Sequence, residues 1–299
     1  MYTAYQNLSG SLEINNLFGG GSGDGMAPNT SPSLSQAGEF DPGWAVAWQA
    51  NTHNLYVTGT GDTGLGMMPH TSPSLCSLGN GWGAAFQAND TSLWVTGNLD
   101  GGGQGLGMAP YTSPSMWSLG NGWGVAFQAN IGTLWLTGNL DGGNTGYLMA
   151  PCTSPSLISL GLGWAAAIQT GNHTLRLLGN LDGGDTGIPL MKGTSPSLGQ
   201  LAGGSWGVAA QGSDGNLVLY GPPGGPIGPS DLGNTGYSMR EGTSPSLSAA
   251  PDNSWSVAFQ SPSGRLCYVG PGRSHTVTSL CMNAGTSPSN AYFTNTSPL

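Results

Sequence analysis

The sequence predicts an all-β fold, a seven-bladed β-propeller that is closed by its own C-terminal segment. Three observations predict it: a phrase that recurs seven times, four strand-length apolar stretches in each repeat, and a chain that begins in mid-repeat. The phrase is Thr-Ser-Pro-Ser, and its copies begin at Thr30, Thr71, Thr112, Thr153, Thr194, Thr243 and Thr286. The first five copies lie 41 residues apart, and the later spacings are 49 and 43. Such a period indicates an array in which each repeat is one supersecondary unit.

The repeat over residues 112–152 shows the expected strands. Apolar stretches at 115–119, 123–128, 134–138 and 145–149 are separated by segments rich in Gly and Asn. Each stretch has the length of a strand, and none leaves room for a helix. Four short antiparallel strands per repeat are typical of a propeller blade. We therefore expect blades over residues 30–70, 71–111, 112–152, 153–193, 194–242 and 243–285.

The seventh blade is expected to combine the two ends of the chain. Residues 4–6 (Ala-Tyr-Gln) match residues 47–49 (Ala-Trp-Gln), so residues 1–29 contain a blade that lacks its opening strand. Residues 286–299 begin with another copy of the phrase and can supply that strand. Closure of this kind leaves no open sheet edge in the ring, and residues 1–299 are predicted to form one domain.

Several residue types recur at fixed places in the repeat. A glutamine occurs in every blade, at Gln6, Gln49, Gln87, Gln128, Gln169, Gln211 and Gln260. A methionine precedes the threonine of the phrase by four residues in six of the seven blades, and Leu190 takes its place in the other. We expect the glutamines to hydrogen-bond to blade backbones and the methionines to fill gaps between sheets. In the phrase itself, proline presets a turn and the hydroxyls satisfy backbone groups.

Composition excludes several partners. The chain has 299 residues, a formal net charge of −9 and only five basic residues, which cannot neutralise a row of phosphates. Nucleic acid and anionic membrane surfaces are therefore unexpected partners, and no apolar run is long enough to insert in a membrane. We see no signal peptide in this chain, and we favour a secreted or cell-surface-acting protein. Homo-oligomer formation is left open.

The residues that usually carry metal or catalytic chemistry are scattered. The cysteines Cys76, Cys152, Cys267 and Cys281 show no Cys-x-x-Cys spacing, so free thiols are expected, with a Cys267–Cys281 disulfide as the alternative. The histidines His53, His70, His173 and His275 occupy different repeat positions, and no nucleophile elbow or calcium loop occurs. We expect no enzyme, no catalytic residue, no metal site and no cofactor. An active site assembled around the central channel is the alternative.

The repeat resembles a known family. Ser-Pro-Ser-Leu, a Gly-rich turn, Trp-x-Val-Ala-Phe-Gln-Ala-Asn and then Leu-Trp are similar to the blades of seven-bladed bacterial propeller lectins of the Photorhabdus lectin type, and also to tectonin-like lectins. The resemblance covers the whole chain. It implies a non-catalytic, multivalent, carbohydrate-binding protein with several similar sites near blade junctions. A protein-interaction scaffold is the second hypothesis.

Strand direction places the tryptophan that opens the second strand on the same face of the disc as the turn between the third and fourth strands. Three sets then share one composition: Trp82, Asn98 and Asp100; Trp123, Asn139 and Asp141; Trp164, Asn180 and Asp182. An aromatic ring covers the apolar face of a sugar, while an amide and a carboxylate bind its hydroxyls. The alternative is that the tryptophans pack the blades and the acidic turns are simple Asx turns.

Two further positions vary in a way that suggests exposure. The residue after the recurring Leu includes Trp94 and Trp135, which we expect as exposed aromatics and as a second set of ligand contacts. The residue before each Thr-Ser-Pro-Ser also varies, and ordinary variation of surface residues explains this as well as ligand binding does. Blades opening at Thr194 and Thr243 carry irregular insertions, so the best sites are expected in the blades opening at Thr71, Thr112 and Thr153.

Overall fold

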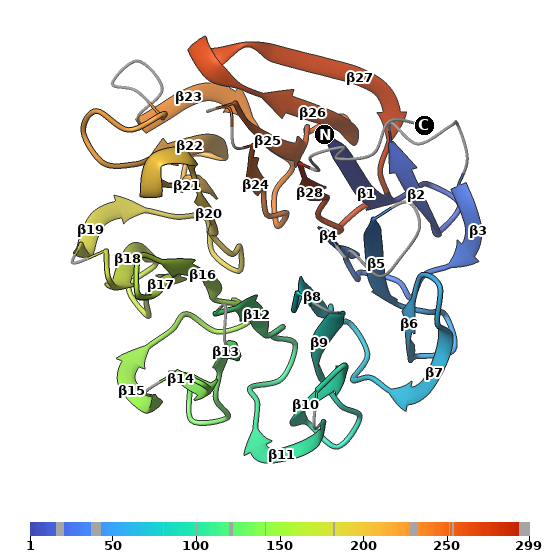
Figure 1. Cartoon of the computed structure of the whole chain (residues 1–299). Helices are drawn as coiled ribbons and strands as arrows, with labels where there is room; N and C mark the ends of the chain where they lie inside the picture. The colour runs from blue at the N-terminus through green and yellow to red at the C-terminus, as the bar shows by residue number, and fades with distance from the viewer. Residues whose placement is uncertain are drawn as a thin grey trace.

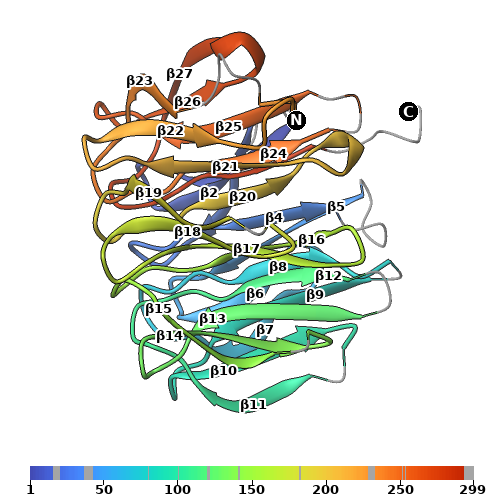
Figure 2. The ribbon, with the colours of Figure 1, turned by 90° about the vertical axis from the view of Figure 1, so that its left-hand side faces the viewer.

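The computed structural model describes residues 1–15, 21–36, 43–79, 81–99, 101–119, 122–140, 142–181, 183–227, 233–250, 252 and 254–292. In this part of the chain, seven four-stranded antiparallel sheets are arranged around a central axis (Figure 1). Seen from the side, the sheets follow one another around the disc (Figure 2). The predicted seven-bladed β-propeller is confirmed.

Each blade runs from an inner strand at the channel to an outer strand at the rim. Blade 1 contains β28 (Ser289–Ala291), β1 (Tyr2–Gln6), β2 (Ser11–Asn15) and β3 (Gly21–Gly25). Blade 2 contains β4 (Ser33–Gln36), β5 (Trp44–Gln49), β6 (Asn54–Val57) and β7 (Gly61–Gly66), and blade 3 contains β8 (Ser74–Ser77), β9 (Trp82–Gln87), β10 (Ser92–Gly97) and β11 (Gly102–Gly107). Blade 4 contains β12 (Ser115–Ser118), β13 (Trp123–Gln128), β14 (Thr133–Gly138) and β15 (Gly143–Leu148), and blade 5 contains β16 (Ser156–Leu160), β17 (Gly163–Gln169), β18 (Thr174–Gly179) and β19 (Gly184–Pro189). Blade 6 contains β20 (Ser197–Gln200), β21 (Trp206–Gln211), β22 (Asn216–Tyr220) and β23 (Gly233–Ser238), and blade 7 contains β24 (Ser246–Ala249), β25 (Trp255–Gln260), β26 (Arg265–Val269) and β27 (His275–Cys281).

The outer strand of each blade is displaced by a β-bulge. In blade 4 the register shifts between Thr133 and Trp135, where β14 pairs with β15. Thr145 Oγ1 donates to the Leu134 carbonyl oxygen at 2.8 Å, which satisfies an acceptor at this irregularity. Equivalent threonines do the same in four other blades, namely Thr63, Thr186, Thr235 and Thr278. A bulge bends the strand that carries it and re-aims its side chains, so the rim strands are shaped by the repeat.

The apolar core lies between blades, where each sheet packs against the next. Met67 of blade 2 is 1% exposed and packs with Ala84 and Phe86 of blade 3. Gln128 is also buried, and its Nε2 donates to the carbonyl oxygens of Met149 and Ala150 at 3.3 and 3.1 Å. The predicted roles of the methionine and glutamine columns are therefore confirmed.

The two ends of the chain meet in blade 1. Strand β28 pairs with β1 in an antiparallel register that aligns Tyr2 with Ala291 and Ala4 with Ser289. Thr3 Oγ1 donates to Asn290 Oδ1 at 3.1 Å across the same pair. The C-terminal segment thus completes the N-terminal blade, as predicted, while residues 293–299 lie outside the described residues.

The serines of the recurring phrase form two closed rings of hydrogen bonds around the axis. In the first ring, the backbone N–H of Ser31 donates to Ser72 Oγ at 2.9 Å. The same step continues through Ser113, Ser154, Ser195, Ser244 and Ser287 and returns to Ser31. In the second ring the donor lies on the later blade: the N–H of Leu75 donates to Ser33 Oγ at 2.9 Å, and every other blade repeats this bond.

Two 3-10 turns, Ala202–Gly204 and Pro271–Arg273, supply the helical structure of the described residues. Neither is long and apolar enough to cross a bilayer. All four cysteines are free thiols, so the alternative of a Cys267–Cys281 disulfide is not realised.

Deleting residues from Thr286 onward should prevent the ring from closing. The deletion removes β28 and one member of each serine ring, so β1 is left with an unpaired edge that can associate with other chains. We expect aggregation, or a large fall in melting temperature, measured by light scattering and calorimetry. A deletion variant that stays monomeric with an unchanged melting temperature would contradict the closure.

Ser72→Ala should destabilise the protein by about 1 kcal/mol, because it leaves the N–H of Ser31 without its acceptor. Ser35→Ala is the matched control, since among the described residues Ser35 Oγ donates only to the adjacent Gln36 carbonyl oxygen. Chemical denaturation of both variants measures the difference. Equal stabilities of the two variants would show that the ring bond is replaceable by water.

Candidate functional site

The predicted pairing of tryptophan with asparagine on one face of the disc is present in the structure. The N–H of Trp82 donates to Asn98 Oδ1 at 3.0 Å, and the N–H of Asn98 donates back to the Trp82 carbonyl oxygen at 2.8 Å. Trp123 and Asn139 make the same two bonds. These asparagines therefore hold the ends of the hairpins, which already uses part of their hydrogen-bonding capacity.

The third set differs in detail, because Asn180 Nδ2 donates to the Leu160 carbonyl oxygen at 2.9 Å while its N–H donates to the Trp164 carbonyl oxygen. Asp100, Asp141 and Asp182 lie outside the described residues. Whether any of the three sets contacts a ligand stays a prediction.

The three tryptophans are not equally accessible. Trp82 is 9% exposed and packs in the core between blades 2 and 3. Trp123 and Trp164 are half-buried against the cores they adjoin. The alternative of a packing role thus describes Trp82 best, and Trp164 retains the surface that a ligand could reach.

A cavity lies beside Trp164, at the junction between blades 4 and 5, which we call the 4–5 junction. Its volume is 350 Å³. Blade 5 contributes Trp164, Leu178 and Gly179, and blade 4 contributes Leu136, Gly142, Gly143, Asn144, Thr145 and Tyr147. The tryptophan therefore shares this cavity with the outer hairpin of the preceding blade, whereas the sequence grouped it with the turn of its own blade.

The walls of the 4–5 junction combine aromatic and amide groups. Tyr147 is 40% exposed. Asn144 is exposed; its Oδ1 accepts from the Gly146 N–H at 2.9 Å, and within the described chain its Nδ2 donates to no protein group. The Arg176 guanidinium lies over the Tyr147 ring, with Cζ 4.5 Å from the ring centroid. Aromatic faces beside free donors are the chemistry that binds neutral polyhydroxylated molecules.

Trp94 and Trp135 occupy the position that Arg176 has in blade 5, and each faces the preceding blade. Each packs against a core that includes residues of the preceding blade, and the rings lie 6.4 Å from Phe86 and 6.5 Å from Phe127 of their own blades, centroid to centroid. Both are half-buried rather than exposed, which corrects the expectation of exposed aromatics at this position. The reason is that this strand face is turned into the junction, where the neighbouring blade covers part of each ring.

The residue before each Thr-Ser-Pro-Ser has a common backbone conformation. Asn29, His70, Tyr111 and Cys152 have φ values between 59° and 64°, and Gly193 has 74°. This conformation favours glycine and asparagine, although His70, Tyr111 and Cys152 also adopt it here. Three of the seven copies of the phrase have a glycine directly before them, and this was the sequence signal for the conformation.

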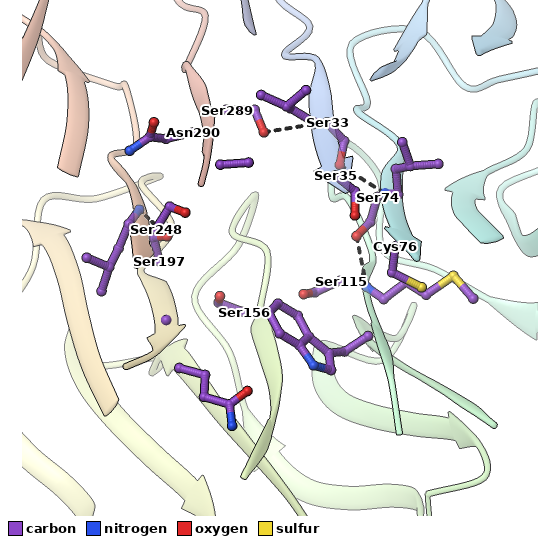
Figure 3. Close-up of a pocket in the computed structure, with 18 of the residues that line it drawn as sticks. Ser33, Ser35, Ser74, Cys76, Ser115, Ser156, Ser197, Ser248, Ser289 and Asn290 are labelled. Atoms are coloured by element: carbon purple, nitrogen blue, oxygen red, sulfur yellow. Dashed lines mark hydrogen bonds between the residues drawn. The ribbon is translucent and has the colours of Figure 1, made fainter. Parts of the chain in front are cut away.

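The central channel forms a second cavity, of 510 Å³ (Figure 3). Serines of the second ring surround it, among them Ser33, Ser74 and Ser115. The described residues of its wall carry no charged side chain, and no group of three potential metal ligands occurs in the described chain. Burial raises the pKa of the Cys76 thiol to about 12, so this wall residue is neutral. The described residues of this wall hold no acidic cluster of the kind that would favour a channel active site.

The irregular blades fill the corresponding junction with their own side chains. Between blades 6 and 7, the His275 ring stacks on Tyr237 with centroids 4.1 Å apart. Trp255 is 1% exposed, and its Nε1 donates to the Pro226 carbonyl oxygen at 3.2 Å. Pro226 belongs to the insertion in blade 6, of which residues 228–232 lie outside the described chain. The insertion thus occupies space that stays open at the 4–5 junction.

Comparison with known proteins identifies the fold. No protein-family model and no curated protein matches the chain. A fucose-binding lectin from Aleuria aurantia, described as a six-bladed β-propeller, superposes with a TM-score of 0.58 at 12% identity, covering 94% of this chain and 99% of the lectin. A mutant of that lectin in complex with Fucα1-6GlcNAc gives a TM-score of 0.56 at 11% identity. The ectodomain of the receptor kinase CR4 from Physcomitrella patens gives 0.52 at 14% identity over 81% of this chain, which spans 63% of that ectodomain. At such identities the likeness shows the propeller fold alone.

Substituting the tryptophans of this column should reduce stability more where the side chain is more deeply buried. Trp82→Ala should cost about 3 to 5 kcal/mol of stability, the range for removing a buried aromatic, and Trp164→Ala should cost clearly less. Denaturant unfolding of the two variants is the measurement. Equal losses would mean that Trp164 is as much a packing residue as Trp82.

Proposed function

We propose that this protein is a non-catalytic lectin that binds saccharides at blade junctions. The observation that carries the proposal is the cavity at the 4–5 junction, where Trp164 and Tyr147 line the same space as Asn144 and Thr145. An aromatic ring packs against the C–H face of a pyranose, and amide and hydroxyl groups bind its equatorial hydroxyls. The propeller lectins that share the fold support this reading. The resemblance to the Photorhabdus lectin type stays a prediction.

The other regular junctions are proposed as weaker versions of the same site. Trp123 adjoins blade 3, whose outer strand carries Leu106 where blade 4 has Tyr147. We propose that Asp100, Asp141 and Asp182, which directly precede the glycines at the rim, add hydroxyl contacts at these junctions. Several weak sites on one rigid disc would bind a glycan-coated surface far more strongly than a single sugar.

A glycan array tests the proposal against the interaction-scaffold alternative. A lectin binds a defined class of glycans, and free sugar of that class competes. Binding to none of the glycans at high protein concentration, together with capture by deglycosylated protein surfaces, would favour the scaffold. Turnover of a bound glycan, detected by chromatography, would overturn the non-catalytic reading.

Changes at the 4–5 junction should weaken sugar binding without unfolding the protein. Trp164→Ala and Tyr147→Leu each remove an aromatic wall, and Leu is the residue that blade 3 carries at the Tyr147 position. We expect about a tenfold loss of affinity at this site, measured by calorimetry with the best array glycan. Ile131→Ala is the control, because Ile131 is 60% exposed on a turn outside the cavity. Unchanged affinity in both cavity variants would place the sugar elsewhere.

Binding should not depend on a metal ion, since the described residues that line the 4–5 junction supply no carboxylate, and Asp141 would add one acidic ligand, fewer than a calcium loop provides. Retention on a glycan surface should therefore be the same before and after treatment with EDTA. Loss of retention that calcium restores would contradict this expectation.

A further inference from the structure

We propose that the 4–5 junction prefers saccharides that bear an oxyanion, a carboxylate or a sulfate, and that Arg176 binds this group. The inference rests on the proposed lectin function and names the ligand class of one of its sites. It starts from the position of Arg176, which faces blade 4 from β18, where the equivalent residues of blades 3 and 4 are Trp94 and Trp135. One junction therefore has a cation where others have an indole.

Among the described residues, Arg176 has no anionic partner. Its guanidinium contacts the Tyr147 ring, and in the described part of the chain it makes no hydrogen bond or ion pair. Its Nε is covered and lacks an acceptor. A covered N–H without an acceptor is costly, and stacking on an aromatic ring does not satisfy it. The side chain is thus held in the junction with its hydrogen-bonding capacity unused.

The acidic residue next to Arg176 in the sheet hydrogen-bonds to other groups. Asp185 lies directly opposite Arg176 across β18 and β19. However, its Oδ1 accepts from the Gly187 N–H and its Oδ2 from Thr174 Oγ1, both at 3.0 Å. The carboxylate therefore binds groups of β18 and β19 and, among the described residues, forms no ion pair with Arg176, which leaves the guanidinium available to an external anion.

Arg176 also lies beside the cavity. Leu178, two residues further along β18, lines the cavity and points to the same face of the strand. Tyr147 lines the cavity as well, and the Arg176 guanidinium stacks on its ring. A pyranose held between Trp164 and Tyr147 would thus present a ring substituent toward Arg176. The guanidinium, by tilting off Tyr147, would give its N–H groups two acceptors in the paired geometry that arginine forms with oxyanions.

The test compares matched ligands on the intact protein. Acidic glycans are arrayed beside their carboxyl-reduced counterparts, and sulfated glycans beside their desulfated counterparts, so that the two sources of the oxyanion are scored separately. We expect the acidic member of at least one kind of pair to bind about tenfold more tightly, with the preference weakening as salt rises. Arg176→Trp, which installs the residue of blade 4, should abolish the preference and keep the melting temperature. Arg265→Gln, in blade 7, is the charge-matched control and should retain it.

A second readout follows the arginine itself. The chain has four arginines, Arg176, Arg240, Arg265 and Arg273, so the Nε–H signals of arginine-labelled protein can be assigned by substitution. The preferred acidic glycan should shift the Arg176 signal, and its neutral counterpart should not. Equal binding of acidic and neutral members, or an unmoved Arg176 signal, would overturn this inference while leaving the lectin function intact. Absence of all glycan binding would overturn both.

Discussion

The ring depends on one hydrogen bond that is repeated around the axis, from a backbone N–H of one blade to a serine hydroxyl of its neighbour. The inner strand of a blade has no strand on its channel side, so its N–H groups there need other acceptors. Each junction has two such bonds, and they are donated in opposite directions, as at Ser31 to Ser72 and Leu75 to Ser33. A blade that shifted along the axis would break bonds to both neighbours, which fixes the height of all seven sheets.

This constraint acts near the axis and leaves the rim free to vary. The buried threonine, glutamine and methionine positions and the half-buried serines of the phrase are nearly the same in every blade, whereas the rim carries Leu106, Tyr147 or Tyr237 at one position. Substitution at the rim changes what a junction exposes without disturbing closure. The 4–5 junction has an open cavity, and the junction between blades 6 and 7 is filled by His275 and the blade 6 insertion. One scaffold therefore supports junctions with different surfaces.

The candidate site was predictable in part. The tryptophans and asparagines could be brought together from strand direction alone, because the two turns of a meander that lie at one end are known once the strands are. Which neighbour Trp164 faces could not be derived this way, since alternation along a strand gives two faces but not which of them meets the preceding blade. For the same reason Trp94 and Trp135 were expected outside, and Tyr147 was not recognised as lining the same cavity as Trp164.

The sequence by itself determined three features of the fold. The number of blades follows from the period of the repeat, the four strands of each blade follow from the apolar stretches between Gly-rich turns, and the joining of the two ends follows from the missing opening strand of the N-terminal blade. It also indicated the roles of the glutamine and serine columns, since a polar residue that recurs in every repeat is expected to hydrogen-bond to a backbone group that recurs as well. Only the tertiary structure decided which junctions are open. That outcome depends on the volumes of side chains from two blades packed against each other, as with Trp164, Leu136 and Tyr147, and no single repeat contains both sides of that contact.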